Sequence, residues 1–140
     1  MDNENTVLAK SEKFAVRIIN LYKYLTLKKK EFVLAKQILR SGTSIGANLF
    51  EAECAISNND WLAKIYIALK ECNETLYWLR LLVKTDFILE KEFSSIYDDC
   101  MEIRKILSAS TKTMADKMKT RKGKATPHST VHTYNHEKSG

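Results

Sequence analysis

The stretch RSGTSIGANLFEAE, residues 40–53, decides the fold because it places small and polar residues inside a regular helical pattern. The apolar positions around it recur every three or four residues, which is the spacing of one helix face. They are Leu34, Ile38, Gly42, Ile45, Leu49, Ala52 and Ile56. Gly42 lies on this face and Gly46 lies beside it, and each costs about 1 kcal/mol of helix stability relative to alanine. A close packing contact must offset that cost.

Polar residues of the same segment form one stripe beside the apolar face, since they advance by four, three, four and three positions. They are Gln37, Ser41, Ser44, Asn48 and Glu51. Small residues let another backbone come near, and the polar side chains can hydrogen-bond across the contact. We expect either a contact within the chain or a contact with a second subunit or ligand. The partner is the third or fourth predicted helix, or a second copy.

Three further segments show the same periodicity, at 5–27, from the SNND cap at 57–60 to residue 83, and at 93–118. With the segment at 31–56 they make four helices joined by short links. Residues 1–120 are therefore expected to form an all-α, antiparallel up-down-up-down four-helix bundle. Residues 121–140 are polar and basic and contain Gly123 and Pro127, so we expect a flexible tail.

Composition agrees with a single all-α domain, because the 140 residues include only four glycines and one proline. The odd number of cysteines, Cys54, Cys72 and Cys100, favours reduced thiols packed among apolar residues. The first residues are polar, and no apolar run is long enough to span a bilayer. These features predict a cytoplasmic protein without a membrane partner.

Basic residues are concentrated near the C-terminus. Residues 1–116 carry 17 Lys and Arg against 16 Asp and Glu, whereas residues 117–140 carry six against one. Two groups are candidate nucleic-acid contacts: Lys28, Lys29 and Lys30 after the first helix, and Lys117, Lys119, Arg121, Lys122 and Lys124 around the end of the fourth. An up-down bundle places these groups at opposite poles. In a ring each group would repeat around one pole, which strengthens phosphate binding without base readout.

An enzymatic site has little support. The three histidines, His128, His132 and His136, all lie in the tail, so the Glu-x-x-His pairs of a di-metal bundle are absent. A helical tail would align these histidines as a metal or anion site, but the expected disorder argues against it. Ser41 and Ser44 have no base at a recognisable spacing, and Glu71 and Glu74 are expected to pair with Lys64, Lys70 or Arg80. The prediction is a protein with no catalysis, cofactor or metal.

Aromatic residues gather along the third predicted helix: Trp61, Tyr66, Tyr77 and Trp78. Aromatics partly off the apolar face are typical of a core or a subunit interface more often than of a base-stacking platform. We expect a homo-oligomeric contact here.

Two long motifs resemble a known family. QILRSGTSIGANLFEAE at 37–53 resembles the second-helix signature of bacterial four-helix-bundle proteins encoded within intervening sequences of 23S ribosomal RNA genes. WLAKIYIALKECNETLYWLRLL at 61–82 resembles that family's E-C-x-E-T-x-x-W-L segment, here with Glu71, Cys72, Glu74, Thr75, Trp78 and Leu79. The similarity covers residues 14–107. Two departures are the lysine run in place of a frequent proline in the first link, and Gly46 in place of proline or alanine.

The resemblance implies a left-handed antiparallel bundle that assembles into a ring, typically a pentamer, with no assigned enzymatic activity. A related branch comprises accessory proteins of diversity-generating retroelements, which bind nucleic acid and a reverse transcriptase. Two functions are thus expected: an oligomeric scaffold that binds RNA or DNA through its lysines, or an accessory subunit that docks a larger enzyme without touching nucleic acid.

Overall fold

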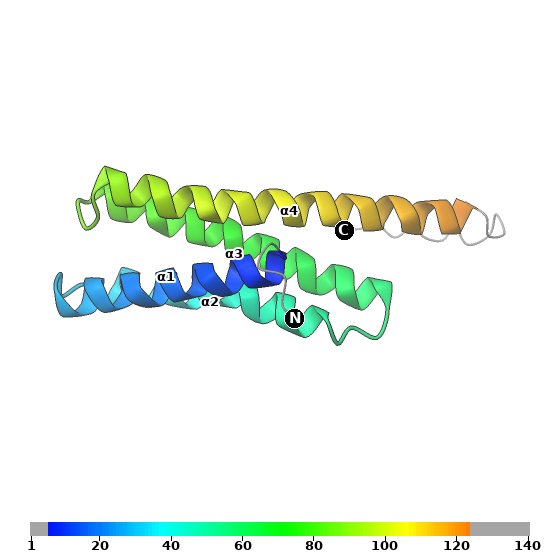
Figure 1. The fold of residues 1–140 in the computed structure, drawn as a ribbon, viewed down its shortest axis with the longest axis horizontal. Helices are drawn as coiled ribbons and strands as arrows, with labels where there is room; N and C mark the ends of the chain where they lie inside the picture. The colour runs from blue at the N-terminus through cyan, green and yellow to red at the C-terminus, as the bar shows by residue number, and fades with distance from the viewer. Residues whose placement is uncertain (1–5, 124–140) are drawn as a thin grey trace, which may run out of the picture.

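The computed structural model describes residues 6–123, which form four α-helices and no strand. The helices are α1 (Val7–Leu27), α2 (Val33–Ala52), α3 (Asn58–Lys84) and α4 (Glu90–Gly123) (Figure 1). The all-α prediction is confirmed for this part of the chain. None of these helices combines the length and apolarity that crossing a membrane would require.

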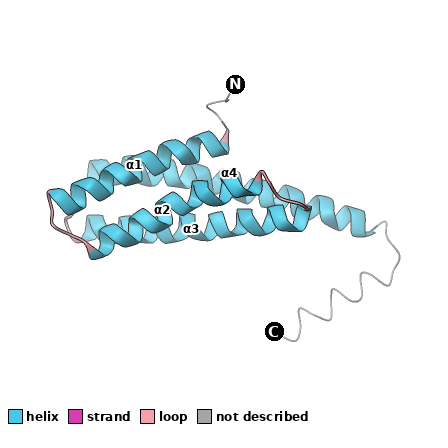
Figure 2. Cartoon of the chain, turned by 90° about the horizontal axis from the view of Figure 1, so that it is seen from below, coloured by secondary structure: helices cyan, strands magenta, loops and turns pink. Residues whose placement is uncertain are grey.

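Consecutive helices lie side by side and run in opposite directions (Figures 1 and 2). α2 packs between α1 and α3, α4 packs on α3, and the contact between α1 and α4 is the least extensive. Lys10 pairs with Glu102 at 2.8 Å and Arg17 with Asp99 at 2.6 Å, as expected for antiparallel α1 and α4. This arrangement is consistent with the up-down-up-down prediction, while the left-handed twist stays a prediction.

Side-chain caps set where two of the helices begin. The Thr6 hydroxyl accepts a hydrogen bond from the Ala9 amide at 3.1 Å, and the Ser57 hydroxyl accepts one from the Asp60 amide at 3.0 Å. Each satisfies a backbone N–H that the first helical turn leaves unpaired. The cap expected at 57–60 is therefore confirmed.

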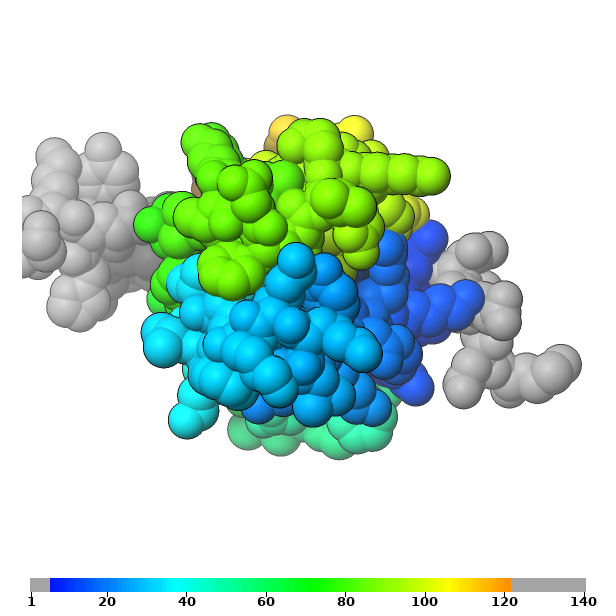
Figure 3. All heavy atoms as spheres, turned by 90° about the vertical axis from the view of Figure 1, so that its left-hand side faces the viewer, coloured from blue at the N-terminus to red at the C-terminus, as the bar shows by residue number. Residues whose placement is uncertain are grey.

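The links after α1 and α3 lie at the same end of the molecule (Figure 3). Each contains one residue in the left-handed region, Lys30 with φ 55° and Asp86 with φ 64°. These backbone reversals let short links join antiparallel neighbours. Lys28, Lys29 and Lys30 are all exposed in the first link.

The hydrophobic core is formed by the helix faces that the apolar spacing predicted, with one exception. Phe14, Ile38, Leu79 and other apolar residues of the four seams are buried. Ile56, expected on the second seam, is 93% exposed. α2 ends at Ala52, and the link that brings Ser57 into its capping position turns Ile56 away from the core.

α4 is longer than the other helices and projects past them (Figure 1). Thr111 is its last buried residue among those whose side chains are described, while Met114 and Met118 are half-buried. The helix continues through Arg121 to Gly123, so the first three residues of the expected tail are helical. Lys124 and the three tail histidines lie outside the described residues, as does the rest of the tail prediction.

Candidate functional site

The two glycines of α2 lie against α1. A Cβ atom on Gly42 would be 2.7 Å from Cγ1 of Ile18, and one on Gly46 would be 3.2 Å from the hydroxyl of Ser11. Both glycines thus permit a close approach within the chain. The expected contact within the chain is confirmed, but the glycines meet the first helix, which was not among the expected partners. The third helix, which was expected, contacts the polar residue Ser41 of the same segment.

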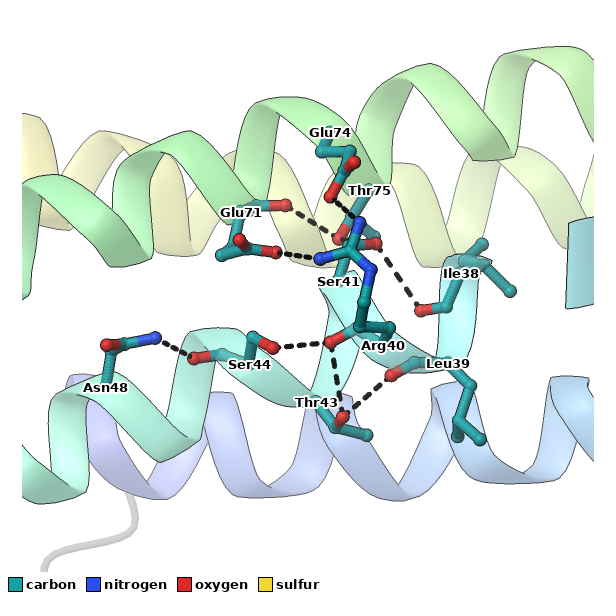
Figure 4. A network of polar contacts seen from close by, with 10 residues as sticks. All are labelled: Ile38, Leu39, Arg40, Ser41, Thr43, Ser44, Asn48, Glu71, Glu74 and Thr75. Atoms are coloured by element: carbon teal, nitrogen blue, oxygen red, sulfur yellow. Dashed lines mark hydrogen bonds and ion pairs between the residues drawn. The ribbon is translucent and has the colours of Figure 1, made fainter. Parts of the chain in front are cut away.

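The polar stripe of α2 turns towards α3, and only part of it bridges the two helices (Figure 4). The Thr75 hydroxyl, which is buried, donates to the Ser41 hydroxyl at 2.9 Å. At the exposed end of the stripe, Glu51 pairs with Lys64 at 3.2 Å. The cross-helix bonding expected of Ser41 is confirmed, and Thr75 is a partner that the sequence did not single out.

Two other stripe residues bond to their own helix. Ser44 donates to the backbone carbonyl of Arg40 at 2.6 Å, and Asn48 donates to that of Ser44 at 2.8 Å. Both side chains are half-buried, as is Gln37. Hydroxyls and amides in a helix can satisfy themselves in this way, so Ser44 and Asn48 need no partner helix.

Arg40 of α2 binds both carboxylates of the Glu71 and Glu74 pair (Figure 4). Its Nη1 lies 3.4 Å from Glu71, and its Nη2 donates to Glu74. The predicted pairing of these glutamates with neighbouring cations of their own helix missed this partner. The sequence pattern that could have predicted this contact is an arginine on one helix and two acids, one turn apart, on the next helix.

Two members of this cluster, Glu71 and Arg40, have raised pKa values for different reasons. Burial raises the pKa of Glu71 above its ordinary value, although the Arg40 guanidinium opposes that rise. The pKa of Arg40 is raised, mainly by its hydrogen bond to Glu74. The guanidinium therefore stays charged and holds two carboxylates of α3, which joins α2 to α3 from outside the core.

The cationic candidates form two separate groups. Lys117, Lys119 and Arg121 are exposed on the projecting part of α4, and Lys122 lies in its last turn. Lys28, Lys29 and Lys30 are at the opposite end of the molecule, and Lys29 stands over the Tyr24 ring at 5.9 Å. One copy of the chain therefore does not bring the two groups together.

The aromatic residues of α3 divide between core and surface. Trp61 and Trp78 pack against the core, whereas Tyr66 and Tyr77 are 47% and 54% exposed. Tyr66 and Tyr77 are eleven residues apart and lie on the same outer side of α3, with the exposed Lys70 and Asn73 between them.

The cysteines differ in environment. Cys72 and Cys100 are buried, and the Cys100 thiol donates to the Cys72 carbonyl oxygen at 3.7 Å. Hydrogen bonding with Cys72 and burial raise the pKa of the Cys100 thiol. Cys54 is exposed after the end of α2, which corrects the expectation that it packs among apolar residues. Within the described residues no group of three or more His, Cys, Asp and Glu side chains is placed to hold a metal ion.

Comparison with known proteins now connects this geometry to a family. The family described as 23S rRNA-intervening sequence protein matches residues 3–109. A crystal structure of a protein of unknown function from the S23 ribosomal protein family of Bacteroides thetaiotaomicron VPI-5482 is 56% identical, with a TM-score of 0.76. The similarity covers 76% of this chain and 99% of that one. No curated protein matches the chain. The family match confirms the resemblance, and the chain belongs to the 23S rRNA-intervening sequence protein family.

Proposed function

We propose that this protein is a non-enzymatic, homo-oligomeric scaffold of the cytoplasm that binds RNA or DNA through phosphate contacts, without reading base sequence. The observation that carries the proposal is the cationic end of α4. Lys112, Lys117, Lys119 and Arg121 are exposed on a helix that projects beyond its neighbours, with Asp116 as the one acid of that segment. A projecting helix can reach a phosphate backbone without obstruction from the bundle, and each neutralised phosphate releases counterions.

Assembly would multiply this effect. Tyr66 and Tyr77, exposed on the same side of α3, supply aromatic side chains of the kind that subunit interfaces use. In a ring, which we propose is a pentamer of left-handed bundles, every α4 end would emerge at the same pole. Cations that bind weakly in one copy would then act together on one nucleic acid.

The opposite end of the bundle is a weaker candidate. Lys28, Lys29 and Lys30 share it with acidic residues of the α3–α4 link and the start of α4, including Asp86 and Glu90. These carboxylates oppose the approach of phosphate. We therefore assign the larger share of binding to α4.

The test is fluorescence anisotropy with labelled duplex RNA and duplex DNA across a range of salt concentrations. Lys117→Gln/Lys119→Gln/Arg121→Gln should weaken binding. It should also make the fall of log K with log salt shallower, by up to about three units of slope. Lys28→Gln/Lys29→Gln/Lys30→Gln, which removes the same charge at the other end, is the matched control and should change binding less. Equal loss in both variants would show that net charge, rather than the α4 end, governs binding.

Assembly is tested separately by light scattering at moderate salt. The wild-type chain should scatter as an oligomer, and Tyr66→Glu/Tyr77→Glu should scatter as a folded monomer. A wild-type chain that stays monomeric throughout the micromolar range would contradict the ring.

An accessory subunit is the second candidate, and the same exposed face of α3 favours it. Tyr66 and Tyr77 would then dock a larger enzyme such as a reverse transcriptase, and the protein would not bind nucleic acid itself. This alternative predicts negligible anisotropy change even at low salt, together with a partner whose binding is lost in Tyr66→Glu/Tyr77→Glu.

A further inference from the structure

Within residues 6–123, α1 does not reach as far as α4 at the end from which α4 projects. α1 stops at its Thr6 cap, and the pairing of Lys10 with Glu102 places that cap near Ile106 of α4. α4 continues to Gly123, roughly 25 Å further along its axis. Among the described residues, no helix of α1 accompanies α3 and α4 beyond Thr6.

A groove occupies the place that a longer α1 would fill. It has a volume of about 470 Å³ and is lined by Trp61, Ile106, Ala109, Ser110, Thr113, Met114 and Lys117. Ile106, Ala109 and Thr113 follow Glu102 at intervals of four, three and four residues, so they share the face of α4 on which α1 packs. The groove is thus a continuation of the α1 track.

The shape and composition of the groove suit a helix. Ala109, Ser110 and Thr113 are small, which allows a close approach, and Trp61 and Met114 supply an apolar floor. An adjoining hollow of about 500 Å³ shares this floor and is bordered by Ile56. On α2, Phe50 follows Gly46 by one turn and is 67% exposed.

Charge selects the kind of helix. Lys117 lines the groove, and Arg121 lies one turn further along the same side of α4, so the two cations outnumber the single acid beside them, Asp116. A second copy would bring the same cationic α4 end, so like charges would oppose its insertion. An acidic helix would instead place carboxylates beside Lys117 and Arg121.

We propose that this groove binds an amphipathic helix of a partner protein, which lies antiparallel to α4 with its apolar stripe on Trp61 and its acidic residues towards Lys117. Most of the lining of α4, from Ser110 to Lys117, follows the last residue of the family match at 109. The site is therefore a property of this chain beyond the matched region. It is separate from the α3 face proposed above, and it shares Lys117 and Arg121 with the phosphate binding proposed there.

The probe is a synthetic helical peptide of about 18 residues, roughly 27 Å long, with leucines at every third or fourth position and glutamates between them. A second peptide has lysines in place of the glutamates. Trp78→Phe leaves Trp61 as the single tryptophan of the full chain, so tryptophan emission reports on the groove. We expect the acidic peptide to shift this emission to the blue and to bind at least about tenfold more tightly than the basic peptide.

Two variants locate the binding. Ala109→Arg puts a long side chain in the groove and should weaken the acidic peptide by about tenfold or more, whereas Ala63→Arg, at an exposed alanine of α3, should leave binding unchanged. Lys117→Glu should reduce the preference for the acidic peptide. Circular dichroism confirms that each variant folds.

Three outcomes would overturn the proposal. Equal affinity for both peptides would show apolar adsorption without charge selection. Binding that Ala109→Arg leaves intact would place the peptide elsewhere. A peptide-free dimer, seen by sedimentation and abolished by Ala109→Arg, would assign the groove to a second copy. Ala109→Arg keeps every cation of α4 and should bind nucleic acid as the wild-type chain does. Loss of peptide binding alone in this variant therefore concerns the groove, whereas absence of nucleic-acid binding in the wild-type chain contradicts only the scaffold function.

Discussion

Gly42 of α2 lies directly against Ile18 of α1, and a Cβ atom at Gly42 would come within 2.7 Å of Cγ1 and 2.8 Å of Cγ2 of that isoleucine. These atoms are the branched root of a buried side chain and cannot swing away. The closest approach of α1 and α2 therefore depends on the absence of a side chain at one position.

Gly42→Ala should lower the free energy of unfolding by about 1–2 kcal/mol. Overpacking costs about 1–3 kcal/mol and outweighs the gain of about 1 kcal/mol in helix propensity. Gly46→Ala is the matched control, because its Cβ would lie 3.2 Å from the Ser11 hydroxyl, a milder contact than the 2.7 Å at Gly42, and it should cost less than Gly42→Ala. Urea unfolding measures both, and equal effects would refute the steric explanation.

The buried hydroxyl pair of Ser41 and Thr75 should show coupling. Thr75→Val should destabilise by about 1–2 kcal/mol, since the Ser41 hydroxyl then keeps only a 3.5 Å contact with the Ile38 carbonyl. Ser41→Ala should cost less, since the Thr75 hydroxyl keeps its bond to the Glu71 carbonyl at 2.8 Å. The double variant should cost less than the sum of the single changes. A double-mutant cycle measures this difference, and strict additivity would mean that the hydroxyls do not depend on each other.

Glu71 should make stability fall as pH rises. Its pKa is raised in the folded state above the ordinary value of 4.5, so the folded chain binds more protons than the unfolded chain between the two values. The contribution of Glu71 is fully present below pH 4.5 and is lost as pH rises through the raised pKa.

Urea unfolding at several pH values tests this effect by comparing the wild-type chain with Glu71→Gln, which should lack it. Arg40→Gln removes the guanidinium that lowers the pKa of Glu71, and should extend the affected pH window upwards. An identical pH profile in all three proteins would contradict the assignment to Glu71.

The three thiols should react at different rates. Cys54 is exposed and should be modified quickly by a thiol reagent in the native protein, whereas Cys72 and Cys100 should react only after unfolding. The raised pKa of Cys100 further lowers its thiolate fraction. Cys54→Ser should therefore abolish the fast phase, and a remaining fast phase would show that the core opens.

The end of α4 should be dispensable for stability. A chain ending at Met118 should unfold within about 0.5 kcal/mol of the full chain, because Thr111 is the last buried side chain of the described helix. A chain ending at Ser110 loses Thr111 and Met114 and should be clearly less stable. Thermal unfolding followed by circular dichroism compares the three lengths.

Short-range sequence patterns predicted most of the helix faces and the helix cap at Ser57. The Ser57 cap and the buried residues Ile38, Leu49 and Cys72 followed from spacing, because a helix face and a capping hydroxyl depend on residues only a few positions apart. Ile56 had the spacing of the apolar face but is exposed, since it lies in the five-residue link, residues 53–57, that supplies the next cap. Competition between two local signals decided that position.

The contacts between residues of different helices could not be predicted in this way. Small residues predict a close contact but not which residue makes it. Gly42 therefore predicted a close approach, and only the tertiary structure shows that its partner is Ile18. Glu71 and Glu74 had cations nearby in sequence, yet Arg40 on another helix bound both. The groove beside Trp61 depends on how far α1 extends along α4, which no single segment encodes.

The order of residues alone determined four helices, their inward faces, the family and the cationic C-terminal end, because each depends on short-range periodicity, composition or motif. Tertiary structure decided which helix meets the glycines, which arginine holds the acidic pair, and where the bundle is left open. These features depend on the register between helices, and register is set by the packing of all the side chains together.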